Sequence, residues 1–264
     1  MKNFFEKKEI NLSNKFKSKG YIISKVQDIK SLNYIKEKTI NNLKKILKLK
    51  KSHEINLNNF HEMIDQESLN DVRVNLINLN NKDDNFRYHY FKTAKDLIYI
   101  LAGNELMMQK SINLSIQFPN DKSSLLPVHS DVWSGDSPFE INLWLPLVDC
   151  YRTKSMYILE EKDNDQFVKY MKKTKLNSSD EIYQRIRKKV KWLNVKYGEF
   201  LLFNQSLPHG NIVNKERETR FSMNCRFKSI YSPYGDKKMG EFFLPITARA
   251  MTEIGIDYKF PFKE

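Results

Sequence analysis

The chain has 264 residues, of which 40% are hydrophobic and 12% aromatic, and it carries a formal net charge of +13. Such an apolar content is typical of a chain that folds around a core, and it excludes an extended disordered protein. Lysine and arginine are spread along the whole length, so the charge predicts no nucleic-acid-binding stripe. A basic surface still favours an anionic small molecule as partner.

The two cysteines, Cys150 and Cys225, give neither a disulfide framework nor a Cys/His zinc pattern, and we expect both to be buried. The first residues, MKNFFEKKEINLSNKF, lack the apolar centre of a secretory signal. Nowhere does an apolar run reach the roughly eighteen residues of a membrane-spanning helix. We therefore expect a soluble, cytoplasmic protein without a membrane partner.

Residues 1–105 are expected to be mainly helical. In SLNYIKEKTINNLKKILKLKK (31–51) apolar side chains recur near helical spacing with lysines between them, and Ser31 is suited to cap the start. LNNFHEMIDQESLNDVRVNLINLNN (57–81) continues the pattern, and FRYHYFKTAKDLIYILAG (86–103) ends at a glycine that suits a helix end. Basic amphipathic helices of this kind usually place a solvated face over a packed one.

After Gly103 the pattern changes, and residues 106–264 are expected to be mainly strands with a helical or mobile insertion near 163–189. SINLSIQF (111–118) alternates apolar and polar side chains with the period of a strand. Four later stretches look extended as well: EINLWLPLVD, SMYILEE, VKWLNVKYGEFLLFNQ and TRFSMNCRFKSI. Short strands between turns predict a sandwich or barrel. Because no linker or repeat divides the chain, residues 1–264 are expected to form a single domain.

The stretch LLPVHSDVWSGD (125–136) places His129 and Asp131 two residues apart. On an extended segment, two such side chains point to the same face. Alone, the pair is as typical of a capped turn as of a ligand site. A third donor, His209, follows a predicted strand at a Pro-His-Gly turn. Two imidazoles and one carboxylate form the facial set that holds Fe(II) and leaves coordination positions open.

Arg220 and Ser222 lie two apart in RETRFSMNCRFKS and share one face of a predicted strand. A guanidinium forms two parallel hydrogen bonds to a carboxylate, and a hydroxyl can add a third. Asn224 and Arg226 continue this polar face, while the alternate residues of the strand are apolar. A polar wall inside a barrel is costly unless it lines a wet pocket or meets a ligand.

The order HSD, PHG, and RFS eleven residues (220 − 209) after His209 resembles the Fe(II)- and 2-oxoglutarate-dependent oxygenases, whose pattern is HxD…H…RxS. The chain looks most similar to the phytanoyl-CoA hydroxylase-like branch, and within it to oxygenases associated with carbohydrate biosynthesis. EINLWLPLVD, SMYILEE and GEFFLPITARAMTEIG carry this closer resemblance, which spans residues 107–255. It implies a double-stranded β-helix, a jelly-roll or cupin-like core, with the N-terminal helices packed on it.

The resemblance also implies roles for individual residues. His129, Asp131 and His209 would bind Fe(II). Arg220, together with Ser222, would bind the distal carboxylate of the co-substrate 2-oxoglutarate.

Four more residues are candidates for contacts within the site. Asn142 is assigned to 2-oxoglutarate or another metal-bound ligand, with an ordinary polar contact between strands as the equal alternative. Trp133 and Asp136 follow the HxD motif, and we expect them near the substrate at the mouth of the barrel. Arg226 is assigned to an anionic group of the substrate, and a structural salt bridge is equally plausible.

Together these residues predict a non-haem Fe(II)/2-oxoglutarate-dependent dioxygenase that hydroxylates, or otherwise oxidises, a small polar metabolite. A sugar or nucleotide-sugar precursor is the first candidate substrate, and an amino acid or acyl thioester is an alternative. A cupin-type metal-dependent isomerase or lyase would not need Arg220 and Ser222. A non-catalytic carbohydrate- or nucleic-acid-binding barrel would need none of the metal donors. No nucleic-acid partner is expected, and the sequence leaves the oligomeric state open.

Overall fold

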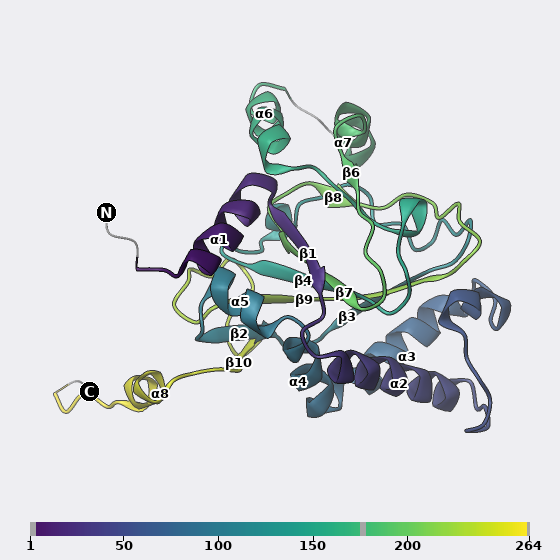
Figure 1. Ribbon diagram of the computed structural model, residues 1–264, viewed down its shortest axis with the longest axis horizontal. Coiled ribbons are helices and arrows are strands. Elements are labelled where there is room, and N and C mark those ends of the chain that lie inside the picture. The colour runs from purple at the N-terminus through teal and green to yellow at the C-terminus, as the bar shows by residue number, and fades with distance from the viewer. Residues whose placement is uncertain (1–3, 175–177, 263–264) are drawn as a thin grey trace.

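The computed structural model of the protein describes residues 4–174 and 178–262. Within these ranges helices surround two sheets of antiparallel strands (Figure 1), and the predicted α+β class is confirmed. The elements are, in chain order, α1 (Lys7–Lys19), β1 (Tyr21–Lys25), α2 (Ile29–Ile46), η1 (Leu57–Glu62), α3 (Leu69–Asn81), α4 (Asp84–Lys92), α5 (Lys95–Ala102), β2 (Leu106–Gln109), β3 (Asn113–Gln117), η2 (Asp131–Ser134), β4 (Ile141–Pro146), η3 (Arg152–Lys154), β5 (Tyr157–Ile158), α6 (Glu161–Met171), α7 (Ser179–Ile186), β6 (Lys191–Trp192), β7 (Glu199–Asn204), β8 (His209–Gly210), β9 (Arg220–Ser229), β10 (Phe243–Pro245) and α8 (Ala250–Asp257).

The predicted N-terminal helices are present, although their ends differ from the expected ones. Helix α2 begins before Ser31, because the Asp28 side chain caps it and accepts a hydrogen bond from the Ser31 amide at 3.2 Å. Gly103 does end α5, in a conformation with φ of 99° that favours glycine. The stretch 57–81 is divided into η1 and α3 rather than forming a continuous helix.

Strand β1 lies in the part of the chain that was predicted to be helical. It pairs antiparallel with β7, with Tyr21 opposite Phe203 and Ile23 opposite Leu201. The five-residue segment YIISK has no regular alternation in burial, so its sequence carries little strand signal. Its extended conformation depends on pairing with a partner far along the chain.

The two sheets have different sizes in the described part of the chain. The larger sheet has the order β1-β7-β4-β9-β2-β10, and β3 also pairs with β9. The smaller sheet has the order β6-β5-β8. Each extended stretch predicted after Gly103 contributes at least one of these strands.

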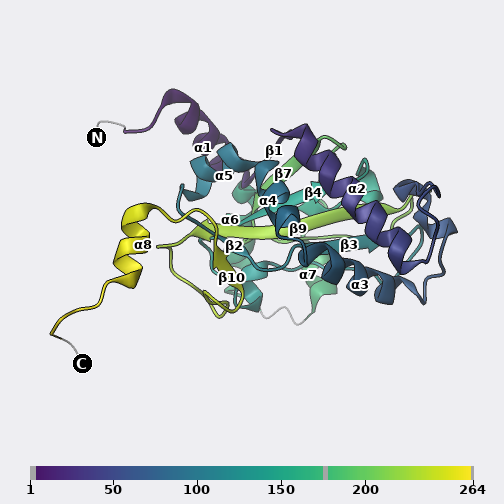
Figure 2. The same cartoon turned by 90° about the horizontal axis from the view of Figure 1, so that it is seen from below.

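Strand β9 divides the interior between the core and a polar face, as its alternation predicted. Phe221 and Phe227 are fully buried and contact rings of the N-terminal part, with centroid distances of 5.3 Å to Phe60 and 6.0 Å to Phe91. Helices α2, α3 and α4 lie together along one side of the larger sheet in both views (Figure 2). The helical third therefore covers the apolar face of β9 and leaves its other face for the site.

The insertion predicted near 163–189 is occupied by α6 and α7 where the structure describes it, and residues 175–177 lie outside the described residues. Ile182 and Ile186 of α7 belong to a second apolar cluster that includes Tyr157 of β5. This cluster attaches the insertion to the smaller sheet. Among the described helices, none combines the length and apolar character needed to cross a membrane.

Candidate metal centre

His129 and His209 are held side by side by their own main chains. The His129 amide donates to the His209 carbonyl at 3.0 Å, and the His209 amide donates to the His129 carbonyl at 2.8 Å. The next segment is attached in the same way, because the Asp131 amide donates to the Gln205 carbonyl at 3.0 Å. Two distant parts of the sequence are thus aligned before any side chain is considered.

Both imidazole rings present the same nitrogen to the site. His129 Nδ1 lies 2.9 Å from the carbonyl oxygen of Pro127, and His209 Nδ1 lies 2.8 Å from that of Leu207. A carbonyl only accepts, so each Nδ1 carries a proton and each ring turns its Nε2 toward the site. Backbone carbonyls commonly orient metal-binding histidines in this way.

The carboxylate of Asp131 faces these lone pairs. Its Oδ1 lies 3.4 Å from His129 Nε2 and 4.0 Å from His209 Nε2, and the donor atoms of the three residues all lie within 4.8 Å of one another. Three electron-pair donors this close repel one another unless a proton or a cation lies between them. The structure therefore brings together the three residues predicted to bind metal.

The ionisation of His209 and Asp131 suits a cation. Burial lowers the pKa of His209 to about 4, with a further lowering by His129, so this ring is neutral near pH 7. Burial by itself would raise the pKa of Asp131, but His129, His209 and Arg226 together outweigh it and lower that pKa below its ordinary value. His209 consequently offers a neutral nitrogen and Asp131 an anionic oxygen, which suit a divalent transition metal.

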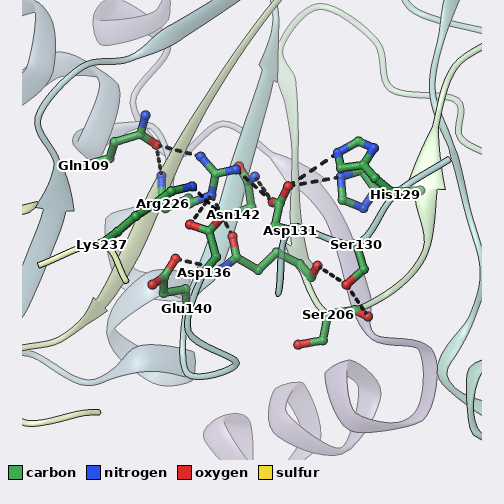
Figure 3. A network of polar contacts seen from close by, with 12 residues as sticks. Gln109, His129, Ser130, Asp131, Asp136, Glu140, Asn142, Ser206, Arg226 and Lys237 are labelled. Atoms are coloured by element: carbon green, nitrogen blue, oxygen red, sulfur yellow. Dashed lines mark hydrogen bonds and ion pairs between the residues drawn. The ribbon is translucent and has the colours of Figure 1, made fainter. Parts of the chain in front are cut away.

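The other oxygen of Asp131 is turned away from the histidines. Arg226 Nη2 lies 3.1 Å from Asp131 Oδ2, and Asn142 Nδ2 donates to the same oxygen at 3.5 Å (Figure 3). For Arg226 this is the salt bridge that the sequence left as an alternative to substrate binding. Asn142 is 1% exposed and is not among the described residues that line the cavity around the histidines, and the contact seen for it is with Asp131, itself a proposed metal ligand.

A cavity of about 480 Å³ lies between the two sheets. It is lined at one place by His129, Asp131 and His209, and elsewhere by Arg220 and Ser222. The predicted metal donors and the predicted carboxylate anchor therefore open into the same space.

Arg220 is 3% exposed and keeps donors available in this cavity. Its Nη1 donates to the Ser155 carbonyl at 3.1 Å and its Nη2 donates to Ser115 Oγ at 2.9 Å. Arg220 Nε and Ser222 Oγ are buried without a hydrogen-bond partner among the described residues. Burial lowers the pKa of Arg220 to about 10, which leaves it charged at neutral pH. A buried cation with unused donors requires an anion to compensate it.

Two residues expected at the mouth of the cavity lie elsewhere. The described residues that line the cavity include neither Trp133 nor Asp136. Trp133 is 49% exposed, and Asp136 is buried and bound to Lys237 at 2.6 Å. The short helix η2 follows directly from Asp131, and beyond it the Asp136 side chain contacts Lys237 and Arg226 instead of lining the cavity.

The cavity also contains residues that the sequence analysis missed. Arg73 on α3 and Ser115 on β3 line it. Neither lies in a motif, and only the packing of α3 and β3 beside β9 brings them there.

Gly210 is a third case, because a Cβ at this position would lie 2.8 Å from the Leu126 carbonyl oxygen. The glycine after His209 thus lets the 125–131 segment pass close to β8.

No family model matches the chain. The streptomycin biosynthesis protein StrG of Streptomyces griseus is 28% identical over 120 residues, which are 44% of this chain and 45% of StrG. The chain thus matches less than half the length of that curated relative.

Solved structures resemble the chain over most of its length. The non-haem monooxygenase ThoJ, in its nickel complex, has a TM-score of 0.58 and 13% identity, covering 91% of this chain and 85% of ThoJ. The epimerase SnoN from nogalamycin biosynthesis, in complex with Fe³⁺, α-ketoglutarate and nogalamycin RO, has a TM-score of 0.53 and 14% identity. The match covers 86% of this chain and 86% of SnoN. EctD from S. alaskensis has a TM-score of 0.52 and 13% identity, and the match covers 85% of this chain and 78% of EctD.

These likenesses establish the fold. The chain has the mixed helical and jelly-roll architecture of the non-haem enzymes named above, and the predicted double-stranded β-helix with packed N-terminal helices is confirmed.

Proposed function

We propose that the protein is an Fe(II)- and 2-oxoglutarate-dependent oxygenase that oxidises, most simply by hydroxylation, a small polar metabolite. The observation that carries the proposal is the cavity shared by the His129/Asp131/His209 cluster and the buried Arg220 with its unused donors. The cluster fits a facially bound divalent metal, and the arginine fits the carboxylate of a keto acid.

Each residue has a distinct task in this proposal. His129 and His209 bind the metal through Nε2, and Asp131 binds it through Oδ1. Arg220 and Ser222 hold the distal carboxylate of 2-oxoglutarate. When bound, Fe(II) supplies the activation of dioxygen that couples oxidative decarboxylation of 2-oxoglutarate to oxidation of a substrate C–H bond.

The lining of the cavity supports a small polar substrate. Besides the proposed binding residues, Asn113, Asn224 and Arg73 contribute polar groups, and Asn224 Oδ1 is buried with no hydrogen-bond partner in the described ranges. A hydroxylated metabolite would satisfy such groups, whereas a long apolar tail would leave them unpaired. A sugar or nucleotide-sugar precursor remains our first candidate. The matches to proteins of streptomycin and nogalamycin biosynthesis support a biosynthetic small molecule.

Two other classes of function fit fewer of the observations. A cupin-type isomerase or lyase would use the metal donors and leave the buried charge of Arg220 uncompensated. A non-catalytic binding barrel would need neither, and it would place three mutually repelling donors in its pocket without a purpose. SnoN is named an epimerase, so the reaction that follows oxygen activation is a separate question from use of the cofactor.

An anaerobic titration tests the proposal. Fe(II) is added to the whole protein, followed by 2-oxoglutarate, and we expect a weak visible charge-transfer band that saturates with the keto acid. Admission of oxygen should then release succinate. Failure to bind Fe(II), or metal binding without any band or succinate, would contradict the proposal. The second result would favour the cupin-type alternative.

A further inference from the structure

The two oxygens of the Asp131 carboxylate have different surroundings. Oδ1 faces the two histidine Nε2 atoms, whereas Oδ2 faces Arg226 and Asn142. The terminal torsion of an aspartate is broad and roughly two-fold, so the side chain alone does not fix which oxygen points where. Groups around it must do so.

Arg226 is itself held from several sides (Figure 3). Its Nε donates to Gln205 Oε1 at 2.8 Å, and its Nη1 donates to Gln109 Oε1 at 3.2 Å. A second acid, Asp136, lies 3.5 Å from Nε. The side chain is about one-tenth exposed, and these contacts leave only Nη2 to reach Asp131.

The partners of Arg226 are fixed in turn. Gln205 Nε2 donates to Glu140 Oε2 at 2.7 Å, which determines that Gln205 turns its oxygen toward the guanidinium. Asp136 is shared with Lys237, 2.6 Å away. Strands β2, β4 and β9 and the loop after β7 all contribute to this network, so the guanidinium is positioned by the sheet rather than by a mobile loop.

We propose that Arg226 is a positioning residue of the metal centre, which holds Asp131 as a one-oxygen ligand. This inference rests on the proposed function, and it would leave Oδ1 as the one oxygen of Asp131 that holds the cation. With Oδ2 occupied by a guanidinium, the carboxylate cannot turn to bind the cation through both oxygens. The fixed positive charge also offsets the charge of Asp131, so the bound metal keeps its attraction for a dianionic keto acid.

The test uses Co(II), whose visible absorption reports the number and geometry of its ligands, added anaerobically to the full-length protein without 2-oxoglutarate. R226M removes the guanidinium. R226K keeps the charge but lacks the planar fork, and it is the deciding variant if R226M does not fold. K228M is the matched control, since Lys228 is a fully buried cation on the same strand whose Nζ donates to the Pro233 carbonyl at 2.6 Å.

We expect R226M to bind Co(II) at least about tenfold more weakly than the wild type, and with a changed visible spectrum. R226K should be intermediate in affinity and also changed in spectrum, while K228M should match the wild type within about twofold. Arg226 variants with the affinity and spectrum of the wild type would overturn the inference, and so would an equal loss in K228M. A wild-type protein that binds no Co(II) would instead contradict the proposed function.

Discussion

The main-chain groups of His129 and His209 donate hydrogen bonds to each other's carbonyl oxygens, at 3.0 and 2.8 Å. This pairing sets the distance between the two rings, whose centroids are 4.3 Å apart. The geometry of the centre therefore comes from backbone pairing next to β8, and side-chain changes should remove a ligand without disturbing the remaining frame.

Loss of one metal donor should abolish tight metal binding. For His209→Ala we expect Fe(II) or Co(II) affinity to fall by more than about a hundredfold, since even outer partners of metal ligands contribute about 10- to 100-fold. Isothermal titration under anaerobic conditions measures the change. His53→Ala is the control, because His53 is exposed and does not belong to the cluster. Unchanged binding by the His209 variant would remove this residue from the proposed ligands.

Changes at Arg220 should weaken binding of the keto acid without weakening binding of the metal. We expect Arg220→Met to lower the affinity for 2-oxoglutarate by at least about thirtyfold. This corresponds to about 2 kcal/mol, as expected when one partner of a buried charge pair is truncated. Co(II) affinity without 2-oxoglutarate should stay within about twofold. Arg220→Lys should recover only part of the loss, because an ammonium cannot form the planar fork. An equal loss of affinity for Co(II) and for 2-oxoglutarate in Arg220→Met would contradict the assigned role.

The contact between Phe221 and Phe60 tests whether helices and sheet fold as one unit. Phe221 is fully buried, so Phe221→Ala should lower the free energy of unfolding by about 3–5 kcal/mol. If residues 1–264 form one domain, denaturant unfolding followed by far-UV circular dichroism and by tryptophan fluorescence should give coincident transitions. Phe139→Ala, at a position that is 57% exposed, should have little effect. Separate transitions for the two signals would argue against the single domain.

The ion pair between Lys154 and Glu218 should be asymmetric in its contribution to stability. Lys154 is fully buried, with its Nζ 2.6 Å from Glu218 Oε2, whereas the Glu218 side chain is 38% exposed. Glu218→Gln leaves a buried ammonium without its counter-charge, and we expect it to cost on the order of 3 kcal/mol. Lys154→Met leaves only a carboxylate that water can reach, and it should cost less. Urea denaturation compares the two variants, and the reverse order would contradict this account.

The sequence by itself determined which donor types the candidate site contains and the strand face on which Arg220 and Ser222 lie. HSD, PHG and RFS supplied donor types that few other functions require together, and the alternation along β9 separated Phe221 and Phe227 from Arg220 and Ser222. Such patterns are local, because a strand repeats every two residues whatever it pairs with. The strands after Gly103 and most N-terminal helices were predictable for the same reason.

Tertiary structure alone decided what each polar side chain contacts. Strand β1 exists because β7 pairs with it, and Arg73 reaches the cavity because α3 packs beside β3. The contact between Arg226 and Asp131 depends on Gln109 and Gln205, which lie 96 residues apart in the sequence (205 − 109). Long side chains have many rotamers and can reach several partners, so their contacts are fixed only when distant segments assemble around them.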